Sequence, residues 1–164
     1  MDHPAVVMGV SGSGKTTVGE ALAQRLGVPF EDGDDLHPPA NVEKMRRGEP
    51  LDDDDRRPWL DLVGEWLAEH ADGGFVACSA LKRKYRDQLR GHAPDVEFVF
   101  LHGSRETIKE RQASRGQHFM PPSLVDSQFD TLEPLDDDER HVTLDVERSV
   151  EELVDDYAAA GGEG

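Results

Sequence analysis

Residues Gly9 to Thr17 hold three glycines, a lysine and four hydroxyl side chains directly after the apolar run 5–8. Their spacing matches G-x-x-x-x-G-K-[ST] in full. Glycines let the backbone wrap so that several N–H groups converge on one phosphate, and the helix that follows points its N-terminal dipole at the same anion. We therefore expect this loop to bind a nucleoside triphosphate through Gly9, Ser11, Gly12, Ser13, Gly14, Lys15, Thr16 and Thr17. Lys15 would reach the β- and γ-phosphates, and the Thr16 hydroxyl would ligate Mg²⁺.

A phosphate-binding loop does not say where the phosphoryl group goes. A GTPase commonly carries N-K-x-D, but the only asparagine is Asn41 and valine follows it. A motor or regulatory ATPase usually has an acid at the end of a buried strand, whereas the run 75–80 ends without one. These absences favour a small-molecule kinase and leave open a regulatory protein that hydrolyses ATP slowly.

Two acids and a basic segment are the other candidates for chemistry. Asp32 and Asp34 flank Gly33 at the end of an expected strand. On an extended segment their side chains would point the same way, beside the phosphate loop. Half of the 18 Lys and Arg residues fall within 82–115, where they could line an anion-binding cleft. Composition alone does not separate such a cleft from an ordinary solvated surface.

The elements that must position these residues alternate along the chain. Short β-branched or aromatic runs predict strands at 4–10, 28–34, 75–80, 96–101 and 141–146. Helical spacing of apolar residues, with proline at starts and glycine at ends, predicts helices between and after them. We therefore expect an α/β fold in a single domain, 1–164, with a parallel five-stranded sheet and helices on both faces. The tail 160–164 is expected to fray.

Composition limits the classes further. The chain has 35 Asp and Glu against 18 Lys and Arg, a net charge of −17, which disfavours nucleic acid as a partner. No apolar run approaches the length of about 18 residues needed to span a membrane, and no signal peptide is evident. The single cysteine, Cys78, excludes an intrachain disulfide. A cytoplasmic protein is expected.

Three longer stretches carry a resemblance. They are "DGDDLHPPANVEKMRRGEPLDDDDRRPWL" (32–60), "CSALKRKYRDQLR" (78–90) and "RGQHFMPPSLVDSQFDTLE" (115–133). Together with the phosphate loop they closely resemble the gluconate kinases, relatives of shikimate kinase and of the nucleoside monophosphate kinases. The likeness runs from about residue 5 to about residue 155. The stretch "LEPLDDDE" differs somewhat from the family pattern, and we attach no function to it.

The resemblance implies transfer of the ATP γ-phosphoryl group to the 6-hydroxyl of gluconate, with Mg²⁺, a lid at about 115–124 and commonly a homodimer. It implies that Asp34 binds the acceptor hydroxyl and that Asp32 supports Mg²⁺ through water. Arg115 would neutralise the transferred phosphoryl group and Arg111 would stack on adenine. The catalytic residues would then be Lys15, Asp34 and Arg115, and the acceptor would contact Asp34, His37, Arg56, Lys82, Tyr85, Arg86 and His118. A kinase of shikimate or of another small hydroxy acid is the nearest alternative.

Overall fold

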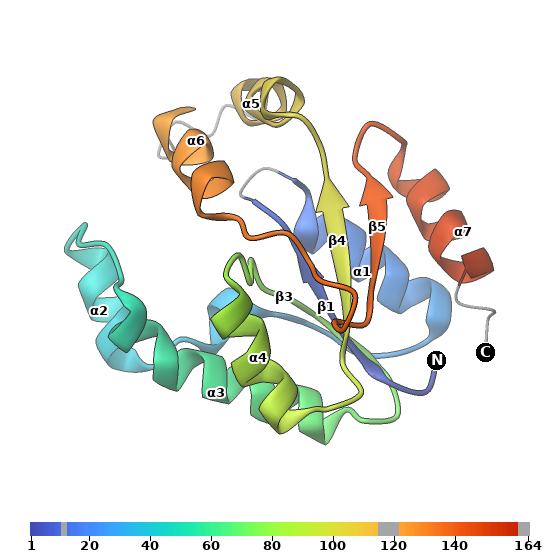
Figure 1. Ribbon diagram of the computed structural model, residues 1–164, viewed down its shortest axis with the longest axis horizontal. Coiled ribbons are helices and arrows are strands. Elements are labelled where there is room, and N and C mark those ends of the chain that lie inside the picture. Colours follow the sequence, from blue (N-terminus) through green and yellow to red (C-terminus); the bar gives the residue numbers. More distant parts are fainter. Residues whose placement is uncertain (11–12, 115–121, 161–164) are drawn as a thin grey trace.

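The structure is a computed structural model that describes residues 1–10, 13–114 and 122–160. Its five strands form one parallel sheet in the order β2-β3-β1-β4-β5 (Figure 1). The strands are β1 (Pro4–Met8), β2 (Phe30–Asp32), β3 (Gly74–Ala77), β4 (Glu97–His102) and β5 (His141–Asp145). The predicted parallel five-stranded sheet is confirmed. Strand β1 lies in the centre with all five residues buried, which explains why its sequence is continuously apolar rather than alternating.

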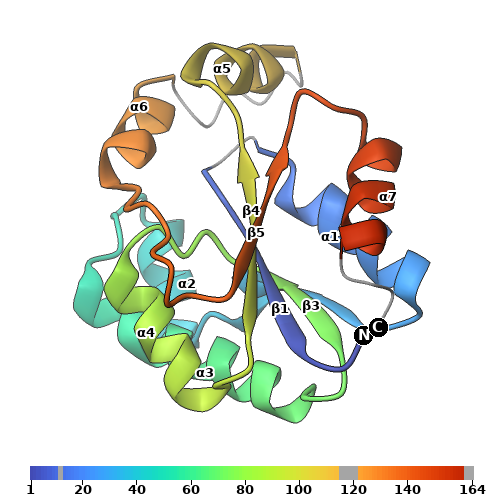
Figure 2. The same cartoon turned by 45° about the vertical axis from the view of Figure 1, so that its right-hand side comes forward.

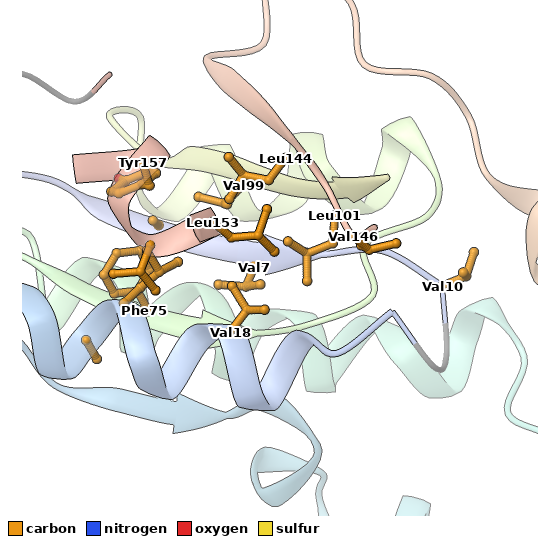
Figure 3. Packing of buried hydrophobic residues seen from close by; sticks show 14 of the residues in the cluster. Val7, Val10, Val18, Phe75, Val99, Leu101, Leu144, Val146, Leu153 and Tyr157 are labelled. Carbon is orange, nitrogen blue, oxygen red and sulfur yellow. The ribbon is translucent and has the colours of Figure 1, made fainter. Parts of the chain in front are cut away.

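Helices cover both faces of the sheet, as the sequence predicts. Helices α1 (Lys15–Leu26) and α7 (Val150–Ala160) lie on one face, and α3 (Asp53–Glu69) and α4 (Arg83–His92) lie on the other (Figures 1 and 2). Figure 3 shows the first of the two resulting cores, in which Val18 of α1 and Leu153 of α7 pack against Val7 and Phe75 of the sheet. The second core places Trp59 and Leu89 against the opposite face.

Three further helices surround the carboxyl ends of the strands. Helix α2 (Pro39–Arg46) precedes α3, and helices α5 (Arg105–Ser114) and α6 (Pro122–Thr131) lie beyond the tips of β4 and β5 in both views (Figures 1 and 2). Parallel sheets bind ligands at this edge. None of the helices in the described ranges is both long and apolar enough to cross a membrane.

Helix α3 starts earlier than its apolar pattern predicts. The apolar residues of this helix begin at Trp59, after a run of acids at 52–55, but the helix itself already begins at Asp53. Asp52 accepts a hydrogen bond from the Asp55 backbone N–H at 2.8 Å, and the Asp55 side chain accepts one from Asp52 N at 2.9 Å. This reciprocal cap and the favourable interaction of acids with a helix N-terminus explain the longer helix.

The segment after β2 also differs from expectation. Instead of continuing as a strand, residues Gly33–Leu36 form a 3₁₀ turn, η1. The Asp32 side chain caps the turn by accepting a hydrogen bond from the Asp34 N–H at 2.9 Å. Asp32 and Asp34 are therefore not two equivalent positions of an extended segment. The expectation of parallel side chains was wrong, because a local side chain to backbone bond stabilises the turn.

Candidate active site

The phosphate loop joins β1 to α1 and depends on glycine at its two ends. Gly9 has φ +149°, and a Cβ there would lie 2.9 Å from Ser13 Oγ and 3.0 Å from the Leu101 carbonyl oxygen. Gly14 has φ +92°, a left-handed conformation that glycine adopts without strain. Ser11 and Gly12, also predicted to bind phosphate, lie outside the described residues.

Ser13 gives an independent indication of a ligand at this loop. Its side chain is 1% exposed, and its hydroxyl has no hydrogen-bond partner among the described residues. An unpartnered buried hydroxyl costs free energy in the ligand-free chain. A phosphate oxygen held in the loop would supply the missing partner, so the local geometry fits the predicted nucleotide site.

Lys15 is the first residue of α1 and folds back over the loop. Its Nζ donates to the carbonyl oxygens of Gly9 at 3.1 Å and Val10 at 3.2 Å. Burial lowers the pKa of Lys15, while the carboxylate of Asp34 acts in the opposite direction. The ammonium group is thus held by two carbonyls at the place where phosphates would approach, and a phosphate oxygen could replace them.

Thr16 and Asp32 bring two oxygens together at the edge between α1 and β2. The Thr16 hydroxyl donates to Asp32 Oδ2 at 3.4 Å. Hydroxyl and carboxylate oxygens are the ligands that Mg²⁺ prefers, and Mg²⁺ usually takes one or two protein oxygens together with substrate phosphates. Within the described ranges, no group of three or more His, Cys, Asp or Glu residues forms a larger cation site. The pair fits the predicted magnesium ligands.

Asp34 lies in η1 on a tightly packed backbone. A Cβ on its neighbour Gly33 would come within 2.4 Å of the Ala77 carbonyl oxygen of β3. The Gly33 carbonyl accepts a buried hydrogen bond from Trp59 Nε1 at 2.8 Å. Although the Asp34 side chain reaches solvent, partial burial and the nearby charge of Asp32 raise its pKa. A carboxylate of raised pKa on a fixed backbone is suited to accept a proton.

A pocket of about 230 Å³ opens between α3, the turn after β3 and α6. It brings together three of the predicted acceptor ligands, Arg56, Lys82 and Tyr85. Lys82 Nζ lies 5.5 Å from the centre of the Tyr85 ring. The remaining lining residues are Trp59, Leu60, Ser79, Ala80, Leu81, Ser127, Gln128 and Thr131. Cationic, phenolic and hydroxyl groups on a partly apolar wall match a polar anion that carries hydroxyls.

Asp53 was missed by the sequence reasoning and organises the basic side chains beside this pocket. Its carboxylate accepts hydrogen bonds from Tyr85 Oη and Lys84 Nζ. Lys82 Nζ and Arg56 Nη1 lie 3.5 Å and 3.7 Å from its Oδ1. Lys84 and Tyr85 hold the pKa of Asp53 well below its usual range. Three cations around one carboxylate leave the cluster net positive. The i, i+3 spacing between Asp53 and Arg56 could have indicated this pairing from the sequence. The run of four aspartates at 52–55 hides it, because several of them lie within reach of a basic residue.

His37 follows η1 and stacks on Trp59, with ring centres 4.3 Å apart and planes 14° apart. Its Nδ1 lies 3.2 Å from Asn41 Nδ2. Burial lowers the pKa of His37, and the guanidinium of Arg56 adds to this effect while Asp34 opposes it. His37 therefore lies close to two of the predicted acceptor ligands as a neutral ring.

Arg86 is the predicted acceptor ligand that the structure contradicts. Its side chain is fully buried, and its Nε donates to Glu139 Oε2 at 2.5 Å. Its Nη1 and Nη2 donate to carbonyl oxygens of the β3–α4 turn and of the segment after α6, at Ala80, Leu81, Glu133 and Pro134. With its donors occupied and its surface covered, Arg86 joins α4 to the acidic segment 133–139 instead of binding a ligand.

The remaining predicted residues belong to α5 and the segment after it. Arg111, in the last turn of α5, donates from Nη2 to the Val146 carbonyl oxygen, so its adenine contact stays a prediction. Arg115 and His118 lie outside the described residues, as do positions 115–121 of the predicted lid. The end of that predicted range overlaps the start of α6.

Comparison with known proteins gives consistent results. The family model for shikimate kinase matches residues 11–158. A gluconokinase of Gluconobacter oxydans (strain 621H) is 51% identical over 161 residues, which span 94% of this chain and 90% of that protein. The thermosensitive gluconokinase of Escherichia coli (strain K12) is 46% identical over 149 residues, 88% of this chain and 80% of the relative. The crystal structure of a gluconokinase from Sinorhizobium meliloti 1021 has a TM-score of 0.89 at 50% identity and covers 99% of this chain and 93% of its own.

Proposed function

Because the chain belongs to the shikimate kinase family and, within it, groups with the gluconokinases, we propose that it phosphorylates gluconate by transferring the γ-phosphoryl group of ATP to the 6-hydroxyl. The observation that carries this proposal is the identity of 51% to a gluconokinase over 94% of the chain. The family model, which matches residues 11–158, includes most of the phosphate loop, the turn η1 and the acceptor pocket.

The phosphate loop and Lys15 bind the triphosphate in this proposal. Lys15 moves from the carbonyls of Gly9 and Val10 to the β- and γ-phosphates, where its charge stabilises the transition state. Thr16 would ligate Mg²⁺ and Asp32, 3.4 Å from the Thr16 hydroxyl, would hold it through water. When bound, Mg²⁺ neutralises charge on the phosphates. Arg111 stacks on adenine, and Arg115 neutralises the transferred group.

Asp34 orients the 6-hydroxyl of gluconate and accepts its proton. The hydroxyl oxygen forms a bond to the γ-phosphorus as the bond between that phosphorus and the β–γ bridging oxygen breaks, and ADP leaves with the electron pair. The raised pKa of Asp34 places its proton affinity closer to neutral pH than that of an ordinary aspartate. Asp32 already accepts the Asp34 N–H, so its carboxylate is committed to the turn and to the metal.

The acceptor pocket between α3, the turn after β3 and α6 binds the carboxylate end of the sugar acid. Arg56 and Lys82 supply positive charge, and Tyr85 supplies a hydroxyl. His37 and His118 contact the hydroxyls. We also propose a cytoplasmic location and a homodimer, which rest on the resemblance to gluconate kinases alone. Light scattering of the purified chain tests the dimer directly.

A coupled assay of ADP release tests the proposal. The full chain is supplied with ATP and Mg²⁺ and with gluconate, shikimate, glucose or no acceptor. We expect gluconate to raise ADP release strongly, and shikimate and the neutral sugar to have little effect. Faster turnover with shikimate would assign a different acceptor. Equal ADP release with and without gluconate would indicate a regulatory ATPase instead of a gluconate kinase.

A further inference from the structure

We propose that Asn41 is a positioning residue that fixes His37 as its Nε2–H tautomer, so that His37 donates a hydrogen bond to a hydroxyl of the acceptor. The inference rests on the proposed function for the identity of that acceptor. The tautomer itself follows from contacts of described residues and does not depend on gluconate.

The amide orientation of Asn41 follows from its contact with the backbone of α3. Asn41 is 4% exposed, and its Nδ2 donates to the Asp55 carbonyl oxygen at 2.9 Å. A backbone carbonyl only accepts hydrogen bonds, so the group that faces it must be the NH₂ of the amide. The opposite orientation would bury two oxygens against each other, which is costly.

The same NH₂ group lies 3.2 Å from Nδ1 of His37. An amide NH₂ has two hydrogens to donate and does not accept hydrogen bonds. One hydrogen is used by Asp55, and the other points to His37. Nδ1 must then present its lone pair, and in a neutral imidazole the proton resides on Nε2. The main-chain carbonyl of Asp55 thus determines the tautomer of a ring 18 positions earlier in the sequence, with Asn41 between them.

The ring is also held in place. It stacks on Trp59, which is itself anchored to the Gly33 carbonyl at 2.8 Å. The Asn41 N–H donates to the Pro38 carbonyl at 2.9 Å in the first turn of α2, and this turn brings the amide back over His37. Stacking on one side and the amide at Nδ1 leave the Nε2 edge as the free donor, because Nε2 forms no hydrogen bond to any of the described residues.

The surroundings of His37 suit a donor to a hydroxyl. Asp34 and Arg56, two of the proposed acceptor contacts, are the charged groups that act on the ring. Partial burial disfavours the imidazolium, so the ring is a neutral donor near neutral pH. The other tautomer would present a lone pair at Nε2, so the acceptor hydroxyl would have to be the donor in its hydrogen bond with the ring. Asn41 therefore makes the ring of His37, and not the acceptor hydroxyl, the donor in the hydrogen bond between them.

Nuclear magnetic resonance of the full-length ¹⁵N-labelled protein at about pH 8, where a histidine of lowered pKa is neutral, reads the tautomer directly. His37→Gln removes one set of ring signals and so assigns His37. We expect a protonated Nε2 and a bare Nδ1 in the wild type. In Asn41→Asp the carboxylate only accepts hydrogen bonds, so the proton should move to Nδ1. A protonated Nδ1 in the wild type overturns the inference even where the variant does not fold, and so does an unchanged tautomer in a folded Asn41→Asp.

Kinetics then test the link to the acceptor. Asn41→Asp should raise the KM for gluconate about threefold to tenfold, the effect of one neutral hydrogen bond, and leave the KM for ATP unchanged. Glu43→Gln, also on α2 but exposed and paired only with Arg46 among the described residues, is the matched control and should change neither. An unchanged KM for gluconate after a tautomer switch, or an equal rise in both KM values, overturns the role. Failure of the wild type to phosphorylate gluconate would defeat the proposed function while the tautomer measurement stands.

Discussion

Replacement of Arg86 tests whether this residue is structural or a ligand. Arg86 is fully buried and makes two hydrogen bonds to Glu139 and four to backbone carbonyls. Arg86→Met preserves much of the length and apolar stem of the side chain but removes the guanidinium. Glu139, which is 1% exposed, would then lose its buried partner and keep only Arg83 Nη1 at 3.4 Å and the Asp136 N–H at 3.2 Å. Breaking a buried pair by removing one member costs about 3–5 kcal/mol, and because Arg83 compensates part of the charge we expect a loss in the free energy of unfolding at the lower end, about 3 kcal/mol.

Urea denaturation followed by circular dichroism measures this loss. Arg90→Met, on the same helix, is the matched control: Arg90 is partly exposed, pairs with Asp87 and donates to the Asp138 carbonyl oxygen, and its loss leaves no buried carboxylate, so it should contribute only about 1 kcal/mol. Arg86→Met combined with Glu139→Leu should recover part of the stability, because no unpaired charge is then buried. If Arg86→Met remains folded, its KM for gluconate should equal that of the wild type. A loss below about 1 kcal/mol together with a raised KM for gluconate would refute the structural role and restore Arg86 as a ligand.

Four other outcomes are expected. Lys15→Met should abolish phosphoryl transfer while circular dichroism remains unchanged, and near-normal kcat would remove the phosphate loop from the mechanism. Arg115→Ala should lower kcat about 1000-fold with a smaller change in the KM for gluconate, whereas a change in KM alone would place Arg115 in the acceptor site. As pH is lowered, kcat/KM should begin to fall at a pH above 3.8, the ordinary pKa of an aspartate, because the pKa of Asp34 is raised and only the ionised carboxylate accepts a proton. A value of kcat/KM that stays constant down to pH 3.8 would contradict this. His3→Gln should destabilise the fold at about pH 5.5 more than at about pH 8.5, because the hydrogen bond that His3 donates to Glu97 raises the pKa of His3 above 6.5. The contribution of His3 to stability is therefore complete below 6.5 and lost as pH rises through the raised value. Equal losses at both pH values would exclude the pair as the cause.

Much of the fold could be predicted because its signals are local. Buried parallel strands such as 4–8 read as continuous apolar runs, and the helices between them show apolar spacing and end at glycines such as Gly27. The alternation of strand and helix then leads to a parallel sheet. The start of α3 and the turn η1 could not be predicted from apolar spacing, because each depends on a hydrogen bond that an aspartate side chain accepts from the backbone N–H two or three residues later.

The site was harder to predict where partners lie far apart in the sequence. Arg86 is one of five basic residues in 82–90, and nothing local marks it as the buried one. Its partner Glu139 lies 53 positions away at the end of an acidic segment, where nothing local distinguishes it from the neighbouring acids. Asp53 is hidden among four aspartates for the same reason. Arg56, Lys82 and Tyr85 could be found because the stretches around them resemble a known family, and the structure places them in one pocket.

Identification of the reaction product tests the central proposal most directly. The full chain is incubated with ATP, Mg²⁺ and gluconate, and the product is analysed by phosphorus and proton nuclear magnetic resonance, with Asp34→Asn treated in parallel. The proposal predicts one phosphate ester, coupled to the two protons on C6, from the wild type and almost none from a variant that still binds ATP. Inorganic phosphate as the only product, an ester at another carbon, or full activity of Asp34→Asn would contradict it.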